Sequence, residues 1–120
     1  MKKCILIFDD DPEILLVCKI ILEKRNYQVE TRLFCDDIIE DIGLVKPDII
    51  LMDLWIPTIG GEKAISLMKN NNATGHIPVI LFSANTDIIA IVNRTNANGF
   101  LQKPFDINTL LGIVENTITK

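Results

Sequence analysis

Short, unbroken apolar runs that each end at a polar residue are the strongest constraint on the fold of this chain. They are residues 4–8, 49–52 and 79–82, followed by Asp9, Asp53 and Ser83. Continuous rather than alternating hydrophobicity is typical of central strands in a parallel sheet, where helices cover both faces. The more mixed residues 27–31 and the shorter residues 99–102 fit strands nearer the edges.

Segments with helical spacing of apolar residues separate these predicted strands. We expect helices over residues 12–24, 36–43, 61–70, 86–95 and 106–119. The first begins at Asp11-Pro12-Glu13, which supplies an N-cap, a proline at the first helical position and an acid in the first turn. Five alternations of strand and helix predict one α/β domain over residues 1–120, with right-handed crossovers and helices on both faces of the sheet.

Composition excludes several classes of protein. A net charge of −4 without a run of Lys or Arg argues against direct nucleic-acid binding. The apolar stretch over residues 14–22 is interrupted by Lys19 and is too short to cross a membrane. The three cysteines form no C-x-x-C pair, so we expect buried, reduced thiols in a cytoplasmic protein.

The polar residues at the predicted strand ends are the candidate site. Strand ends of a parallel sheet meet at one edge, which would bring Asp9, Asp10, Asp53, Ser83 and Lys103 together. Carboxylates about 4 Å apart repel by about 4 kcal/mol at an effective dielectric of about 20, and a hard divalent cation such as Mg²⁺ relieves that repulsion. The hydroxyl and the ammonium add donors for a phosphoryl group, so the pattern indicates phosphoryl transfer to a carboxylate.

Four segments, taken in order along the chain, resemble the receiver domain of two-component response regulators. They are residues 5–13 (ILIFDDDPE), 47–57 (PDIILMDLWIP), 80–84 (ILFSA) and 100–105 (FLQKPF). The resemblance spans essentially the whole chain. It implies a doubly wound, flavodoxin-like sheet of five parallel strands in the order 2-1-3-4-5.

The resemblance also implies roles for single residues around a metal. Asp53 would accept the phosphoryl group. Asp10 and Asp53 would bind Mg²⁺ or Mn²⁺ directly, together with the backbone carbonyl of Trp55, and Asp9 would act mainly through a metal-bound water. Lys103 would pair with Asp53 at rest and with the phosphoryl group afterwards.

Two further positions would report the phosphorylation state. Ser83 would hydrogen-bond the phosphoryl oxygen, and Phe100 occupies the aromatic switch position. The family usually has a cis peptide bond at the position of Lys103–Pro104. Trp55 is unusually large for a residue bordering the phosphoryl group, and we expect its indole to hinder attacking water.

The implied function is a phosphorylation-gated switch rather than an enzyme that turns over a substrate. A histidine kinase or phosphotransfer protein would donate the phosphoryl group. A downstream protein would then recognise the surface of the fourth helix, fifth strand and fifth helix. Residues 88–92 are apolar almost all round, so part of them should be exposed beside Phe100. That surface offers few charged pairs for a symmetric dimer, and we expect a monomer or weak dimer.

The main alternative is a phosphatase of the haloacid-dehalogenase type, with Asp9 and Asp11 as its paired acids. It leaves Asp53 without a role, and we expect Asp11 to act as a helix N-cap instead. The single histidine, His76, lies in a predicted loop away from the strand ends and is expected to be solvated. Gly60-Gly61 is expected to form a turn with positive φ.

Overall fold

The computed structural model describes residues 2–84 and 87–118. Strands and helices alternate along the chain as the sequence predicts. The elements are β1 (Cys4–Phe8), α1 (Pro12–Glu23), β2 (Gln28–Arg32), α2 (Ile38–Val45), β3 (Ile49–Asp53), α3 (Gly61–Lys69), β4 (Val79–Ser83), α4 (Ile88–Thr95), β5 (Gly99–Gln102) and α5 (Ile107–Ile118).

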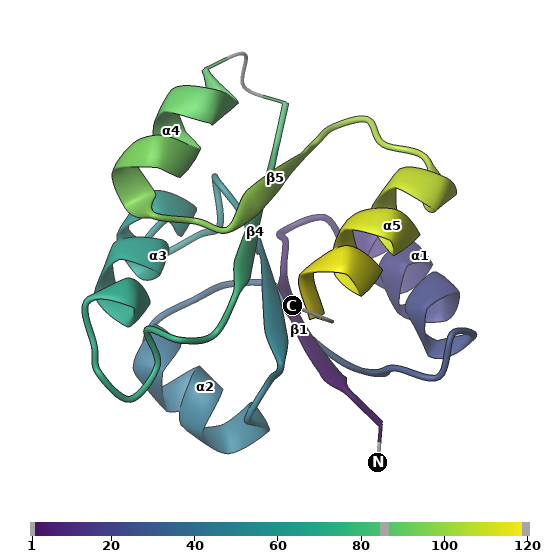
Figure 1. Cartoon of the computed structure of the whole chain (residues 1–120), viewed down its shortest axis with the longest axis horizontal. Coiled ribbons are helices and arrows are strands. Elements are labelled where there is room, and N and C mark those ends of the chain that lie inside the picture. The colour runs from purple at the N-terminus through teal and green to yellow at the C-terminus, as the bar shows by residue number, and fades with distance from the viewer. Residues whose placement is uncertain (1, 85–86, 119–120) are drawn as a thin grey trace.

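The five strands form one sheet in the order β2-β1-β3-β4-β5, and every neighbouring pair is parallel. This confirms the predicted doubly wound, flavodoxin-like arrangement. Figure 1 shows α1 and α5 on one face of the sheet and α2, α3 and α4 on the other. All residues of β1, β3 and β4 are buried, whereas β2 and β5 at the edges are partly exposed, which explains why only the inner strands are uniformly apolar.

Each face of the sheet has its own hydrophobic core. Alternate strand residues, such as Leu6 and Ile7, point to opposite faces. One core joins the strands to α2, α3 and α4, and the other joins them to α1 and α5. The loops that follow the strands therefore rest on a sheet that is packed on both sides.

Several element boundaries differ from the sequence prediction. The second helix was expected to end near Gly43 and extends to Val45, because the left-handed residue is Lys46 (φ 54°), whose N–H donates to the carbonyl of Ile42. β2 lies one residue later than expected. Thr86 and Thr119, the expected start of the fourth helix and end of the fifth, lie outside the described residues.

The predicted N-cap at Asp11 and the predicted buried thiols are present in the structure, together with a second N-cap at Asp37. The carboxylate of Asp11 accepts from the N–H of Glu13, and that of Asp37 accepts from the N–H of Glu40. All three cysteines are buried and free, and burial is the main cause that raises the pKa of Cys18 and Cys35 to about 12. These thiols are therefore unreactive at neutral pH. Within residues 2–84 and 87–118, no helix has both the length and the apolar character needed to cross a bilayer.

Candidate functional site

The predicted site residues gather at the carboxyl edge of the sheet. Asp9 and Asp10 directly follow β1, Asp53 ends β3, Ser83 ends β4 and Lys103 directly follows β5. One carboxylate oxygen from each of the three aspartates lies within 4.8 Å of the other two. The three aspartates and Lys103 therefore meet as expected, because parallel strands bring their ends to the same edge, and Ser83 lies at that edge at the end of β4.

The ammonium of Lys103 bridges two of these carboxylates. Its Nζ donates to Asp9 Oδ2 at 2.7 Å and to Asp53 Oδ1 at 3.4 Å. Pairing with Asp53 was expected, but the shorter bond to Asp9 was not. The other oxygen of Asp9 accepts from the N–H of Asp11 at 2.9 Å, so Asp9 is held from both sides. The peptide bond between Lys103 and Pro104 is cis, as expected.

Burial makes the charges of this site costly. Asp9 is 0% exposed and Asp53 is 4% exposed, whereas Asp10 is open to solvent. Burial, followed by the charge of Asp9, raises the pKa of Asp53 above its usual value, although Lys103 opposes both effects. Burial alone would lower the pKa of Lys103, but its hydrogen bonds and the two negative charges outweigh burial, and the net shift is upward.

The donor set fits a hard divalent cation. Three carboxylates converge, Lys103 is the only ammonium paired with them among residues 2–84 and 87–118, and Asp10 leaves the cluster accessible from solvent. Oxygen ligands of this kind suit Mg²⁺ and Mn²⁺. A cation at the site would also offset the electrostatic cost that the raised pKa of Asp53 reports.

The segment after Asp53 is held against the site by a close backbone approach. The N–H of Gly61 donates to the carbonyl of Leu54 at 2.9 Å. A Cβ on Gly61 would lie 2.3 Å from the carbonyl oxygen of Asp53, so only glycine fits there. The expected turn is present at Gly60, where φ is 80°. The packing role of Gly61 was missed, because a Gly-Gly pair in a sequence does not distinguish a turn from a close contact.

The remaining predicted residues lie around this site. Ser83 is 1% exposed at the end of β4. Trp55 is 71% exposed and lines a groove between α3 and α4. Phe100 on β5 is 36% exposed. His76 is exposed in the loop before β4, as expected.

The apolar stretch of residues 88–92 is only partly exposed. Ile88 and Ile91 are buried against the sheet, whereas Ile89 is 62% exposed and Ala90 is also open to solvent. The prediction of some exposed apolar surface on this helix is therefore confirmed, for one side of α4 only.

Without a divalent cation, Asp53→Asn is expected to raise the free energy of unfolding at neutral pH by about 1 kcal/mol. Because the pKa of Asp53 is raised in the folded chain, its ionised form opposes folding, and this cost is complete above the folded-state pKa. The gain should shrink as pH falls through the folded-state pKa and vanish below the ordinary value of 3.8, where the carboxyl is protonated in both states.

Urea unfolding at several pH values measures this gain. Asp36→Asn, which removes the same charge from an exposed residue, is the control. A variant that is less stable than the wild type at neutral pH, or a gain that does not change with pH, would contradict the explanation.

Comparison with known proteins gives a consistent result. Residues 5–115 match the family model of the response regulator receiver domain. The DNA-binding transcriptional regulator NtrC of Proteus hauseri is 29% identical over 94% of this chain and 24% of its own length. Protein PilG of Pseudomonas aeruginosa is 28% identical over 92% of this chain and 84% of its own length. The chain spans only 17% to 26% of the length of several curated relatives that it matches.

Solved structures share the fold. The crystal structure of a protein described as a putative response regulator from Chloroflexus aurantiacus superposes with a TM-score of 0.93 at 21% identity, and the superposition covers 100% of this chain and 100% of that one. The chemotaxis response regulator CheY4 of Vibrio cholerae superposes with a TM-score of 0.88 at 21% identity, over 97% of this chain and 98% of its own.

Proposed function

Because this chain belongs to the response regulator receiver domain family, we propose that residues 1–120 act as a phosphorylation-gated switch whose phospho-acceptor is Asp53. One observation carries the proposal: three carboxylates from two strand ends lie within 4.8 Å of one another, with the Lys103 ammonium bound to two of them. A receiver domain is a signalling domain and not an enzyme that turns over a separate substrate.

The chemistry assigned to Asp53 is a single group transfer. An oxygen of its carboxylate attacks the phosphorus of a phosphohistidine in line with the leaving imidazole. The new O–P bond forms as the P–N bond breaks, the bonding electron pair stays on the ring nitrogen, and the imidazole leaves as a neutral base because its other ring nitrogen carries a proton. The ammonium of Lys103 already bonds the acceptor carboxylate at 3.4 Å, so it is close enough to stabilise the charge that would develop on the phosphoryl oxygens.

We assign Mg²⁺, with Mn²⁺ as a substitute, to Asp9, Asp10, Asp53 and the backbone carbonyl of Trp55. The cation would supply Lewis-acid stabilisation of the transferred group. The protein holds Asp9 by two hydrogen bonds, from Lys103 and from the backbone of Asp11, before any cation binds. Asp10 is exposed and provides the open side of the site.

Phosphorylation would act through Ser83 and Phe100. Ser83 is buried at the end of β4, and its hydroxyl would move to hydrogen-bond a phosphoryl oxygen. Phe100 on the adjacent β5 would then turn inward into the space that the Ser83 side chain leaves. The surface formed by α4, β5 and α5 would then change its preferred partner. To shift the two states from 1:99 to 99:1 requires a differential stabilisation of about 5.5 kcal/mol.

The partners belong to the proposal as well. A histidine kinase or phosphotransfer protein would be the donor, and a downstream protein would bind the α4–β5–α5 surface. The net charge of −4 argues against direct binding to nucleic acid. The buried free thiols support a reducing, cytoplasmic setting. We expect a monomer or a weak dimer.

The haloacid-dehalogenase alternative receives no support from the family match. Its second acid, Asp11, is already engaged, because its carboxylate caps α1 by accepting from the N–H of Glu13. The alternative also leaves unexplained why Lys103 binds Asp53.

Incubation with acetyl phosphate and Mg²⁺ is expected to add one phosphoryl group to the wild type, as intact-mass spectrometry would show. EDTA should abolish the addition, because repulsion between the carboxylates then opposes an incoming phosphoryl group. Asp53→Asn should remain unlabelled, whereas the control Asp36→Asn should label like the wild type. Full labelling of Asp53→Asn would refute the assignment.

Trp55→Ala is expected to shorten the lifetime of the phosphorylated state about 3-fold, because we expect the large indole, two residues after the acceptor, to hinder water that attacks the phosphoryl group. Loss of the phosphoryl group is followed by mass spectrometry after the donor is removed. Leu44→Ala, which truncates an equally exposed apolar residue on α2, is the control. A Trp55→Ala protein that loses the group no faster than the wild type would contradict this role.

A further inference from the structure

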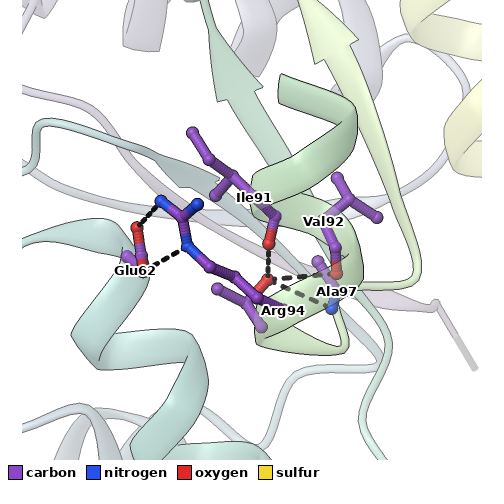
Figure 2. Close-up of polar contacts among 6 residues, drawn as sticks. Glu62, Ile91, Val92, Arg94 and Ala97 are labelled. Atoms are coloured by element: carbon purple, nitrogen blue, oxygen red, sulfur yellow. Dashed lines mark hydrogen bonds and ion pairs between the residues drawn. The ribbon is translucent and has the colours of Figure 1, made fainter. Parts of the chain in front are cut away.

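A bidentate ion pair joins α3 to α4. Arg94 Nε donates to Glu62 Oε2 at 2.8 Å, and Arg94 Nη2 donates to Glu62 Oε1 at 2.9 Å (Figure 2). Glu62 lies in the first turn of α3 and Arg94 in the last turn of α4, where each charge also complements its own helix dipole. The two parallel hydrogen bonds of the fork set how the guanidinium and the carboxylate face each other across the two helices.

The end of α4 that carries Arg94 is itself fixed. The buried hydroxyl of Thr95 donates to the carbonyl of Ile91 at 2.7 Å and accepts from the N–H of Ala97 at 3.4 Å (Figure 2). The next residue, Asn96, is left-handed and ends the helix. Arg94 therefore lies in a hydrogen-bonded helical turn and not at a frayed helix end.

Apolar packing between α3 and α4 is incomplete around this ion pair. A groove of about 500 Å³ lies between the two helices, with Trp55 and Ile91 among its lining residues and the ion pair on its wall. Of the eight residues of α4, only Ile88, Ile91 and Thr95 are buried. The Glu62–Arg94 pair is thus a principal link between the helices on this side of the groove.

The α3 end of the link connects to the phospho-acceptor through backbone contacts. Glu62 directly follows Gly61, whose N–H bonds the carbonyl of Leu54 and whose Cα lies against the carbonyl of Asp53. A movement of the segment after Asp53 therefore displaces Gly61 and, with it, the carboxylate that Arg94 holds.

We propose that Glu62 and Arg94 form a latch that holds α4 in its unphosphorylated position, so that breaking the pair favours phosphorylation of Asp53. The inference rests on the proposed function and adds a regulatory element to it. The ion pair is formed in the unphosphorylated structure, and a shift of α4 that carries Arg94 away from Glu62 would break its two-point geometry. Thermodynamic linkage makes the two effects reciprocal. The factor by which phosphorylation weakens an interaction of the resting state is also the factor by which that interaction lowers the population of the phosphorylated conformation.

The expected size of the effect follows from the exposure of the pair. The side chains are 57% and 43% exposed, so solvent screens their attraction and the coupling is modest. Loss of the latch should therefore raise both hydrogen exchange in α4 and the initial rate of Asp53 labelling by roughly 2- to 5-fold.

A double-mutant cycle tests the latch. Glu62→Ala, Arg94→Ala and the double variant are compared with the wild type, and Glu40→Ala, an exposed first-turn glutamate of α2, is the matched control. Hydrogen exchange of residues 88–95 is measured without a phosphodonor, and the labelling rate is measured with acetyl phosphate and Mg²⁺. Each single variant should give the full 2- to 5-fold rise in both readouts, and the double variant should add nothing further.

Salt provides a second arm of the test. In about 1 M NaCl the Debye length falls to about 3 Å, which weakens the ion pair in the wild type. The exchange and labelling rates of the wild type should then approach those of the latch variants. The rates of the latch variants themselves should change little when compared with Glu40→Ala. Unchanged or slower labelling in the single variants would overturn the latch, as would additive effects in the double variant. Failure of the wild type to label at all would instead overturn the proposed function, and the latch with it.

Discussion

Lys103→Met is expected to slow labelling of Asp53 by acetyl phosphate about 100-fold, because it removes the ammonium that bonds Asp53 and would face the developing charge. Methionine keeps much of the length and apolar volume of lysine, so the change is mainly electrostatic. The same substitution should leave Mg²⁺ binding intact or tighten it, because the ammonium and the cation compete for the carboxylate of Asp9.

Two readouts separate these effects. Trp55 is the only tryptophan and lies two residues after Asp53, so its fluorescence reports Mg²⁺ titrations, while mass spectrometry gives the labelling rate. Lys24→Met, at an exposed position after α1, is the control for loss of a positive charge. A Lys103→Met protein that binds Mg²⁺ and labels within 3-fold of the wild-type rate would contradict the role of Lys103.

Gly61→Ala is expected to destabilise the protein by about 3 kcal/mol, near the upper end of the cost of overpacking. The new Cβ would lie 2.3 Å from the carbonyl oxygen of Asp53 and 2.8 Å from the Cα of Leu54. Both neighbours are backbone atoms, so relief of the clash requires movement of the main chain at Asp53 and Leu54.

Urea unfolding measures the loss, and Gly43→Ala provides the opposite control. A Cβ on Gly43 meets nothing within 4 Å, and the residue lies inside α2, so this substitution should stabilise the protein by about 0.5–1 kcal/mol. Equal stability of the Gly61→Ala protein and the wild type would show that the close approach does not constrain this loop.

Much of the fold was predictable because local patterns and topology agree. The inner strands are uniformly apolar, which indicates that helices cover both faces of the sheet. Parallel pairing of these strands then brings Asp9, Asp53 and Ser83 to one edge. Asp11 could be identified as an N-cap because Pro12 follows it at the first helical position. Residues next to a strand end or a helix start are therefore the ones that a sequence locates best.

Features that depend on the packing of distant segments could not be predicted. Glu62 and Arg94 are separated by 32 positions and lie on helices whose relative tilt no periodicity encodes. The shorter bond of Lys103 to Asp9 depends on the exact course of two loops. The end of α2 was misplaced because Gly43 looked like a terminator, whereas Lys46 adopts the left-handed conformation.

The central claim is that the strand-end cluster makes Asp53, and no other carboxylate, the phospho-acceptor. Borohydride reduces an aspartyl phosphate to homoserine, so labelling with acetyl phosphate and Mg²⁺, reduction, digestion and peptide sequencing by mass spectrometry locate the modified residue directly. We predict homoserine at position 53 alone, and only when Mg²⁺ is present. Homoserine at position 9 or 10, or at no aspartate in a labelled protein, would contradict the claim.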